Sequence, residues 1–234
     1  DENMNLSLSL MNKYESMRKS SIFDARSRKG DTILMNLAKA GNINAIEYIV
    51  MNKEISFLNR DIYGNNILHK ILKGRYATND RIIYCISLIV KKCPELILQR
   101  NRNGKNPFMI AAQKGFIGIL GLMSTIYPIK VLDSSLDQSV IHLAAKKNHR
   151  ETIRYIVQVL HIDVNSQSKD GFTPIQFAAM KSCVLSYREL LSLGANPLIK
   201  NPIYKMNAID FAMKYGAEKM IKFVMETPSF SYAL

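Results

Sequence analysis

The sequence is poor in the residues and motifs from which catalytic and metal sites are usually built. Its 234 residues include no tryptophan, three cysteines and 19 acidic residues against 32 lysines and arginines. It contains no glycine-rich phosphate loop, no Gly-x-Ser-x-Gly elbow and no His-Glu-x-x-His helix. The cysteines form no Cys-x-x-Cys pair, which suits a reducing compartment, and Cys85 and Cys93 stand among apolar neighbours as packing residues would. We therefore expect a cytoplasmic chain without catalytic residues, bound metal or cofactor.

No segment has the length and composition of a membrane span. The longest uncharged stretch, residues 115–129, is shorter than the roughly 18 residues required and contains three glycines and a proline. The first residues, Asp1 to Asn3, are acidic and polar, unlike the basic start of a secretory signal. Because the chain starts without methionine, we expect it to be a piece of a longer protein that could hold an activity elsewhere. If that parent is a membrane protein, this piece would lie on the cytosolic side.

The charge balance is strongly basic, with a formal net charge of +13 at pH 7. Such a charge permits attraction to nucleic acid, to anionic lipid or to an acidic protein segment, and it does not choose among them. Hydrophobic residues make up 47% of the chain and charged residues 22%, as in ordinary globular domains. The chain is also rich in Ile, Asn and Lys, a bias that an AT-rich genome would produce, so part of the basicity could be compositional drift.

Six short segments recur along the chain at a nearly constant period. Each begins with a small polar residue that can cap a helix and continues with apolar residues. We call these first residues the anchors: Thr32, Asn66, Asn106, Ser139, Thr173 and Asn207. The anchors are separated by 34, 40, 33, 34 and 34 positions. A spacing this regular indicates a repeat architecture.

Each repeat is predicted to be a pair of helices. Nine residues after five anchors stands a residue that can take the left-handed conformation and end a helix of about two turns: Gly41, Gly115, Asn148, Ser182 and Gly216. A second apolar stretch with helical spacing follows each stop. Two residues before four anchors stands a glycine suited to a tight turn: Gly30, Gly64, Gly104 and Gly171. Asp137 and Lys205 take its place in repeats four and six, where we expect turns of a different shape.

These features resemble the ankyrin repeat family, whose unit of about 33 residues is a β-turn followed by two helices. The likeness is most specific in the fifth repeat, where residues 170–174 read Asp-Gly-Phe-Thr-Pro and residues 190–197 read Leu-Leu-Ser-Leu-Gly-Ala-Asn-Pro. Repeat two departs most, through extra residues around Arg75 to Arg81 that lengthen its loop. The resemblance implies an all-α fold, an ankyrin-repeat solenoid of stacked helix-turn-helix units with short β-turn fingers.

On this basis the chain divides into three parts. Residues 26–226 are predicted to form six repeats, at about 26–59, 60–99, 100–132, 133–166, 167–200 and 201–226. Residues 1–25 are either a capping helix over the first repeat or a flexible segment, because Leu10, Tyr14 and Met17 share helical spacing while chain ends are often disordered. Residues 227–234 are a C-terminal tail.

The four histidines favour structural roles. His69 and His142 both stand at the fourth place of the repeat signature, where the family uses histidine to hydrogen-bond the neighbouring turn. They lie more than one repeat apart, too far to share a metal ion. His149 and His161 stand near loops, where we expect them to be solvated.

The resemblance also implies where a partner docks: on the concave side, at the finger tips and at the seventh and eighth residues after each anchor. The latter positions supply at least one lysine per repeat: Lys39, Lys73, Lys114, Lys146, Lys147, Lys181 and Lys214. Stacked at about 10 Å per repeat, they would form a positive row. The finger tips add residues of types that anchor interfaces: Arg28, Tyr63, Arg102, Lys105, Lys169, Phe172 and Tyr204. The alternative is the ordinary solvated surface of a lysine-rich protein.

Three functional hypotheses follow. The first is a non-catalytic adaptor or scaffold, monomeric, whose basic face binds a protein or peptide, with an acidic segment as the natural complement. The second is a substrate-recruiting domain of a larger enzyme or membrane protein, such as an S-acyltransferase, a channel or a kinase. The third, direct binding to nucleic acid or anionic lipid, is less favoured because the sequence offers no recognition helix and no basic amphipathic helix of membrane type.

Overall fold

The computed structural model describes residues 23, 25–53, 55–74, 80–129 and 138–227, and the structural statements below concern these residues. The described residues form twelve α-helices and one short 3-10 helix, with no β-strand beyond an isolated bridge between Arg26 and Thr32. The chain divides into two compact units, residues 1–107 (unit 1) and residues 108–234 (unit 2). Most of the N-terminal cap or flexible segment expected at residues 1–25, the middle of the repeat-two insertion and Asp137 lie outside the described residues.

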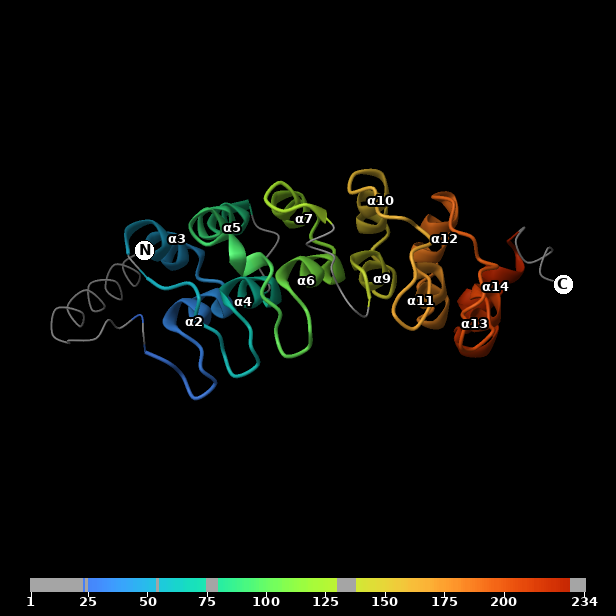
Figure 1. The fold of residues 1–234 in the computed structure, drawn as a ribbon, viewed down its shortest axis with the longest axis horizontal. Helices are drawn as coiled ribbons and strands as arrows, with labels where there is room; N and C mark the ends of the chain where they lie inside the picture. Colours follow the sequence, from blue (N-terminus) through green and yellow to red (C-terminus); the bar gives the residue numbers. More distant parts are fainter. Residues whose placement is uncertain (1–22, 24, 54, 75–79, 130–137, 228–234) are drawn as a thin grey trace. The chain divides into compact units, whose positions relative to one another are not determined.

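Unit 1 contains two helix pairs and the finger of the third repeat. The fingers are the turns that precede the first helices, at residues 26–31, 60–65 and 100–105 in this unit. The pairs are α2 (Ile33–Ala40) with α3 (Ile43–Asn52) and α4 (Ile67–Lys73) with α5 (Asp80–Lys92), followed by the 3-10 helix η2 (Pro94–Ile97). The helix α2 packs against α4, and α3 packs against α5. The first helices therefore form one layer and the second helices another, and the fingers extend beyond the first layer (Figure 1).

Unit 2 repeats this arrangement. Its pairs are α6 (Pro107–Lys114, in this unit from Phe108 on) with α7 (Ile117–Ser124), α9 (Val140–Ala145) with α10 (Arg150–Gln158), α11 (Pro174–Met180) with α12 (Val184–Ser192), and α13 (Ala208–Tyr215) with α14 (Glu218–Met225). The helix α11 packs between α9 and α13, while α12 contacts α10 and α14. The predicted all-α fold of stacked helix pairs is confirmed.

The anchors begin the first helices as capping residues. The Thr32 hydroxyl accepts from the Met35 amide at 3.2 Å, the Asn66 side chain from the His69 amide at 3.1 Å, and the Asn207 side chain from the Asp210 amide at 3.0 Å. A side-chain oxygen in this place satisfies an amide that the helix itself leaves unpaired. The first helices are six to eight residues long, so the predicted length of about two turns is confirmed.

Four of the five predicted left-handed stops are confirmed. The φ angles are 74° at Gly41, 81° at Gly115, 62° at Asn148 and 55° at Ser182. The prediction is wrong for Gly216, whose φ is −72°. A Cβ at that position would overlap the carbonyl oxygen of Ala212, so close approach of the backbone, rather than a left-handed turn, favours glycine there.

The fingers share a turn built on a polar side chain. Asp61 Oδ1 accepts from the amides of Tyr63 at 2.9 Å and Asn65 at 2.7 Å, and Asn101 Oδ1 holds the next finger in the same way. In repeat six the bond from the Asn201 amide to the Met206 carbonyl closes a finger one residue longer, and Lys205 takes the left-handed conformation with φ 58°. The expected difference in shape is confirmed for this finger.

Neighbouring fingers are tied together by backbone hydrogen bonds. The Ile62 amide donates to the Lys29 carbonyl at 3.0 Å, and the Arg102 amide donates to the Tyr63 carbonyl at 2.9 Å. In unit 2 the side chain of Asn201 donates to the Asp170 carbonyl at 2.9 Å. Residues at equivalent positions of successive repeats therefore lie side by side within each unit.

Candidate protein-binding surface

The two signature histidines fasten each first helix to the next finger. His69 is fully buried, and its Nε2 lies 2.9 Å from the carbonyl oxygen of Lys105. His142 is also buried, with Nε2 2.9 Å from the Phe172 carbonyl oxygen and 3.1 Å from that of Ser166. Burial lowers the pKa of each imidazole to about 4, so both rings are neutral at pH 7. The predicted bond to the neighbouring turn is confirmed.

A buried charged cluster lies beneath the fingers of unit 1. Lys70 forms ion pairs with Asp31 and with Asp61, the latter at 2.7 Å, and all three side chains are nearly inaccessible to solvent. Burial opposes the charged form of Asp61, but hydrogen bonds from Asn65 and Lys70 outweigh it and lower its pKa. The two carboxylates in turn raise the pKa of Lys70 against the effect of burial. Asp61 and Lys70 are therefore both charged and paired with each other at neutral pH.

Lys73 is joined to the same cluster, although it was predicted to meet a partner. Its Nζ donates to Asn65 Oδ1 at 2.9 Å, and the side-chain amide of Asn101 donates to the same oxygen at 3.0 Å. Burial lowers the pKa of Lys73. At least one hydrogen bond of this lysine is therefore made within unit 1 and not to a partner.

A column of arginines on the fingers of unit 1 was missed in the sequence. Arg26, Arg60 and Arg100 stand six residues before their anchors. Arg26 donates to the Arg60 carbonyl at 3.4 Å, Arg60 donates to the Arg100 carbonyl, and Arg100 donates to the Gly104 carbonyl at 2.7 Å. The column therefore links successive fingers. Comparing the aligned repeats one column at a time would have revealed it.

Unit 2 has aromatic rings where unit 1 has the charged cluster. Phe172 and Phe177 lie 5.1 Å apart between ring centroids, and Phe211 lies 5.5 Å from Phe172. Tyr204 contacts both Phe172 and Phe211, at 5.6 Å and 6.1 Å, and Tyr215 stacks on Phe211 at 6.2 Å. We call these five residues the aromatic cluster. Phenylalanines fill its interior, and the two tyrosines are about half exposed.

Lysines border the aromatic cluster. Lys146 Nζ lies 5.4 Å from the centroid of the Phe177 ring, and Lys214 Nζ lies 5.3 Å from that of Tyr215. Such contacts are favourable because the ring face is electron-rich. Burial lowers the pKa of Lys146, and the positive charges of Lys181 and Lys147 lower it further. Lys147 of the same repeat and Lys181 of the next repeat are therefore close enough to Lys146 to repel its charge.

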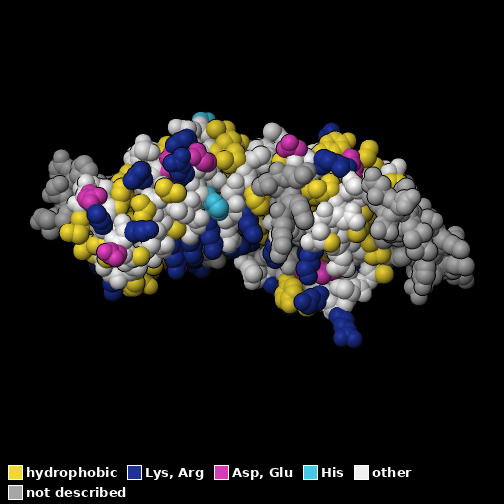
Figure 2. Space-filling model, turned by 180° about the vertical axis from the view of Figure 1, so that it is seen from behind, with side chains coloured by type: hydrophobic (Ala, Val, Ile, Leu, Met, Phe, Trp, Pro, Cys, Tyr) yellow, Lys and Arg dark blue, Asp and Glu magenta, His cyan; other side chains and the backbone are white. Residues whose placement is uncertain are grey.

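The remaining predicted residues are mostly exposed. The exposed members are Arg28, Lys39, Tyr63, Arg102, Lys114, Lys147, Lys169, Lys181, Tyr204 and Lys214, while Lys105 and Lys146 are half-buried. Phe172 needs correction, because it is only 9% exposed and packs inside the aromatic cluster. Lys and Arg side chains gather along the lower margin of the face shown in Figure 2. We call the finger tips together with the fourth, seventh and eighth residues after each anchor the finger face.

Comparison with known proteins decides the family. The family model described as "Ankyrin repeats (3 copies)" matches residues 108–201 and 141–231, which together cover more than half of the chain. The chain belongs to the ankyrin repeat family. Its fold is similar to that of the ankyrin repeat domain of Bcl-3, described as a unique member of the IkappaB protein family, with a TM-score of 0.65 at 15% identity over 92% of this chain and 90% of that one.

Sequence relatives of this ankyrin repeat chain cover it only in part. Alpha-latrotoxin-Lhe1a of Latrodectus hesperus is 29% identical over 116 residues, which are 49% of this chain and 8% of the toxin. The IkB-like protein of African swine fever virus (isolate Pig/Kenya/KEN-50/1950) is 34% identical over 84 residues, or 35% of each chain. The chain thus spans about a third of one relative and less than a tenth of the other.

The other histidines and the cysteines of the ankyrin chain lie outside the positions that define the finger face, although the Cys183 thiol donates to the Lys146 carbonyl at 3.5 Å. His149 was expected to be solvated, but it is partly buried: its ring lies against Gly115 and its Nε2 is 3.1 Å from the Gln113 carbonyl oxygen. Burial raises the pKa of Cys85 to about 11 and also raises that of Cys183, so both thiols are protonated at pH 7. Within the described ranges, no three His, Cys, Asp or Glu side chains are grouped as metal ligands would be.

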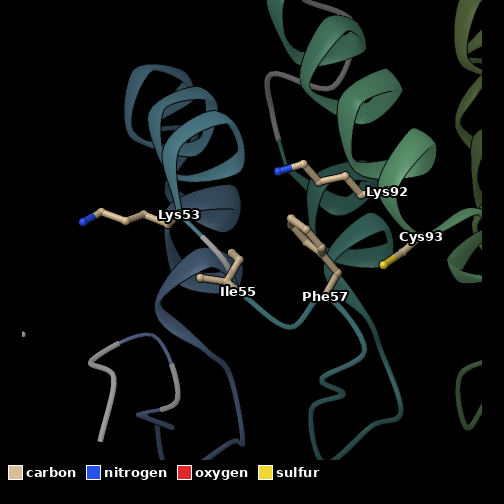
Figure 3. A pocket seen from close by; sticks show the side chains of 5 residues that line it. All are labelled: Lys53, Ile55, Phe57, Lys92 and Cys93. Atoms are coloured by element: carbon tan, nitrogen blue, oxygen red, sulfur yellow. The ribbon is translucent and has the colours of Figure 1, made fainter. Parts of the chain in front are cut away.

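A pocket of about 400 Å³ opens in unit 1, away from the fingers (Figure 3). It is lined by Lys53, Ile55, Phe57, Lys92 and Cys93. Lys92 extends above Phe57, where its Nζ donates to the Val50 carbonyl at 2.6 Å, while Lys53 points away. Burial raises the pKa of Cys93, which disfavours the reactive thiolate.

Among the described helices, none has the length and apolar character needed to cross a bilayer.

Proposed function

We propose that this chain is a non-catalytic interaction module that works as a cytoplasmic monomer and binds an acidic protein segment on its basic finger face. The observation that carries the proposal is the position of Lys146, which lies over the Phe177 ring of the aromatic cluster and is close enough to Lys181 and Lys147 for their charges to lower its pKa. Like charges held together repel, and a carboxylate placed between them relieves that repulsion. A negatively charged partner is therefore the natural complement of this surface.

The family and its relatives support a protein as the partner. Ankyrin repeats serve as interaction modules, and the likeness to an IkB-like protein and to Bcl-3 points to the same role. Exposed Tyr63 and Tyr204 on the fingers add the residue type most often found at interface anchors. A scaffold or adaptor role for the whole protein is part of this proposal.

A second candidate function is recruitment of a substrate to a larger protein of which this chain is one part. The small share of the latrotoxin that the chain covers favours this reading, because related repeats there belong to a much longer chain. The parent would be an enzyme or membrane protein, with an S-acyltransferase, a channel or a kinase as examples. Sequencing the full gene separates the two candidates, since a second domain supports recruitment and a gene that encodes only these repeats contradicts it.

The charge proposal is tested by two charge reversals of equal size. Lys147→Glu with Lys181→Glu alters the finger face, whereas Lys219→Glu with Lys222→Glu alters exposed positions on α14. The probe is a fluorescein-labelled 12-residue peptide of alternating Glu and Ser, and its affinity is measured by fluorescence polarisation at 50 and 150 mM NaCl. We expect the first pair to weaken binding at least tenfold and the second less than twofold.

Two control probes complete this experiment: a peptide of alternating Lys and Ser, and a 12-nucleotide oligothymidine. Equal losses in the two variant pairs would show that only net charge matters and would overturn the proposal. Tighter binding of the oligothymidine than of the acidic peptide would favour nucleic acid over protein. No binding of the acidic peptide at low salt would also contradict the proposal.

A further inference from the structure

The sixth repeat exposes two tyrosines that the structure holds in place. Tyr204 is 53% exposed and Tyr215 is 47% exposed. Tyr204 comes from the finger, and Tyr215 is the last residue of α13. Both rings rest on Phe211, which is itself 1% exposed, with interplanar angles of 75° and 26°.

The support beneath these tyrosines continues into the fifth repeat. Tyr204 also contacts Phe172, which contacts Phe177, and Phe177 packs against His142 with ring centroids 5.7 Å apart. The imidazole of His142 is in turn fixed by two backbone carbonyls. An aromatic side chain fixed in this way loses little conformational freedom when a partner binds, so more of the contact energy is available for affinity.

Three lysines lie near the tyrosines or the rings that support them. Lys214 lies over Tyr215, Lys146 lies over Phe177, and Lys205 follows Tyr204 directly in the finger. The one carboxylate on the first turn of α13, Asp210, accepts a hydrogen bond from the Asn207 amide at 2.8 Å, so it is committed to the helix cap. An apolar surface bordered by lysines matches a side chain that is apolar itself and has acidic neighbours.

We propose that Tyr204 and Tyr215 form an anchor site for an extended protein segment that carries one aromatic or large aliphatic residue flanked by carboxylates. The apolar side chain packs on the two tyrosines, and its acidic neighbours pair with Lys146 and Lys214. The proposal rests on the protein-binding function proposed above and adds the place of the anchor and the chemistry of the partner.

The test starts from a bead-displayed library of random 12-residue peptides, selected on the full chain at 150 mM NaCl. We expect the enriched peptides to share one Phe, Tyr, Trp, Leu or Ile with Asp or Glu within two residues on either side. The affinity of an enriched peptide is then measured for Tyr204→Ala and Tyr215→Ala. Each variant should bind at least tenfold more weakly, as expected for an aromatic anchor.

Matched controls separate loss of the anchor from loss of the fold. Tyr84→Ala removes a tyrosine of similar exposure on α5 and should change affinity less than twofold. Tyr204→Phe and Tyr215→Phe keep the rings and should retain most of the affinity. Circular dichroism of each variant at 25 °C confirms the helical content.

The outcomes also distinguish the anchor site from the proposed binding of an acidic segment on which it rests. If charge reversal of Lys147 and Lys181 lowers the affinity for the peptide while Tyr204→Ala and Tyr215→Ala do not, the anchor site is overturned and the binding of an acidic segment by the basic finger face is supported. If neither set of changes affects binding, both proposals fail. Enriched peptides without acidic residues, or no enrichment at all, would overturn the anchor site as well.

Discussion

Units 1 and 2 fill the same position of the repeat with opposite chemistry. Four residues after its anchor, α4 of unit 1 carries Lys70, which is held between Asp31 and Asp61. At the same place in unit 2, α11 and α13 carry Phe177 and Phe211 of the aromatic cluster. The backbone is equivalent in both, because capped first helices and hydrogen-bonded fingers occur in each unit.

The difference shows that the ankyrin fold does not determine which types of side chain its finger face carries. Charged groups beneath the fingers of unit 1 satisfy one another, so they add little that a partner could use. The rings in unit 2 pack on one another without using up charged groups, and they support exposed tyrosines beside lysines. We therefore place binding in unit 2 and a mainly structural role in the charged cluster of unit 1.

The largest expected effect comes from removing the cation of the charged cluster. Lys70→Ala leaves Asp31 and Asp61 buried without their partner, and we expect the free energy of unfolding to fall by about 4 kcal/mol. Urea unfolding followed by circular dichroism measures this change. Adding Asp61→Asn to the same chain should restore part of the loss. A loss below about 1 kcal/mol for Lys70→Ala would show that the cluster is not buried as described.

Acid should act on both units through their signature histidines. The folded-state pKa of about 4 lies below the ordinary value of 6.5, so the stabilisation is present above pH 6.5 and is lost as the pH falls toward 4. Each histidine accounts for up to about 3 kcal/mol at pH 4. Unit 1 should lose more below that pH, because the pKa of Asp61 is also lowered. Hydrogen exchange at pH 7, 5.5, 4 and 3 compares the protection of the two units, and constant protection across this range would contradict the account.

A matched pair of finger glycines sharpens the comparison further. Gly104 in unit 1 and Gly171 in unit 2 have nearly equal φ angles of 70° and 73°. A Cβ at Gly104 meets no atom of the described residues within 4 Å, whereas one at Gly171 would overlap the ring of Pro202 in the next finger. We expect Gly104→Ala to lower the free energy of unfolding by about 1 kcal/mol and Gly171→Ala by about 2 kcal/mol. Equal losses would indicate that the fingers of unit 2 are not packed together.

A conservative change inside the aromatic cluster should have only a small effect on stability. Phe211→Leu keeps an apolar side chain at a buried position, and we expect the free energy of unfolding to fall by about 1 kcal/mol. The support of both tyrosines is lost, however, so affinity for an enriched peptide should fall at least fivefold. Thermal unfolding and fluorescence polarisation measure the two quantities. Unchanged affinity would show that Tyr204 and Tyr215 do not depend on Phe211 for binding.

The helix pairs could be predicted from the sequence because their signals are local. An anchor such as Thr32 caps its own helix, and Gly41 or Asn148 ends it through its own backbone angle. The error at Gly216 arose because its role depends on contact with Ala212 rather than on a turn. Glycine alone does not reveal which of the two reasons applies.

The candidate site could be predicted only in part. The lysines at the seventh and eighth places follow from the repeat register, and Lys146, Lys147 and Lys181 do lie near one another. The burial of Phe172 and the pairing of Lys70 depend on side chains from different repeats, which no single repeat contains. These features require the packing of the fingers to be known.

The most direct test of binding in unit 2 is the position of a bound partner. An enriched peptide with photoreactive benzoylphenylalanine at its apolar position is cross-linked to the full chain, and the linked residues are identified by mass spectrometry. The account predicts links within residues 172–181 and 203–215. Links confined to the fingers of unit 1, at residues 26–31, 60–65 and 100–105, would contradict it.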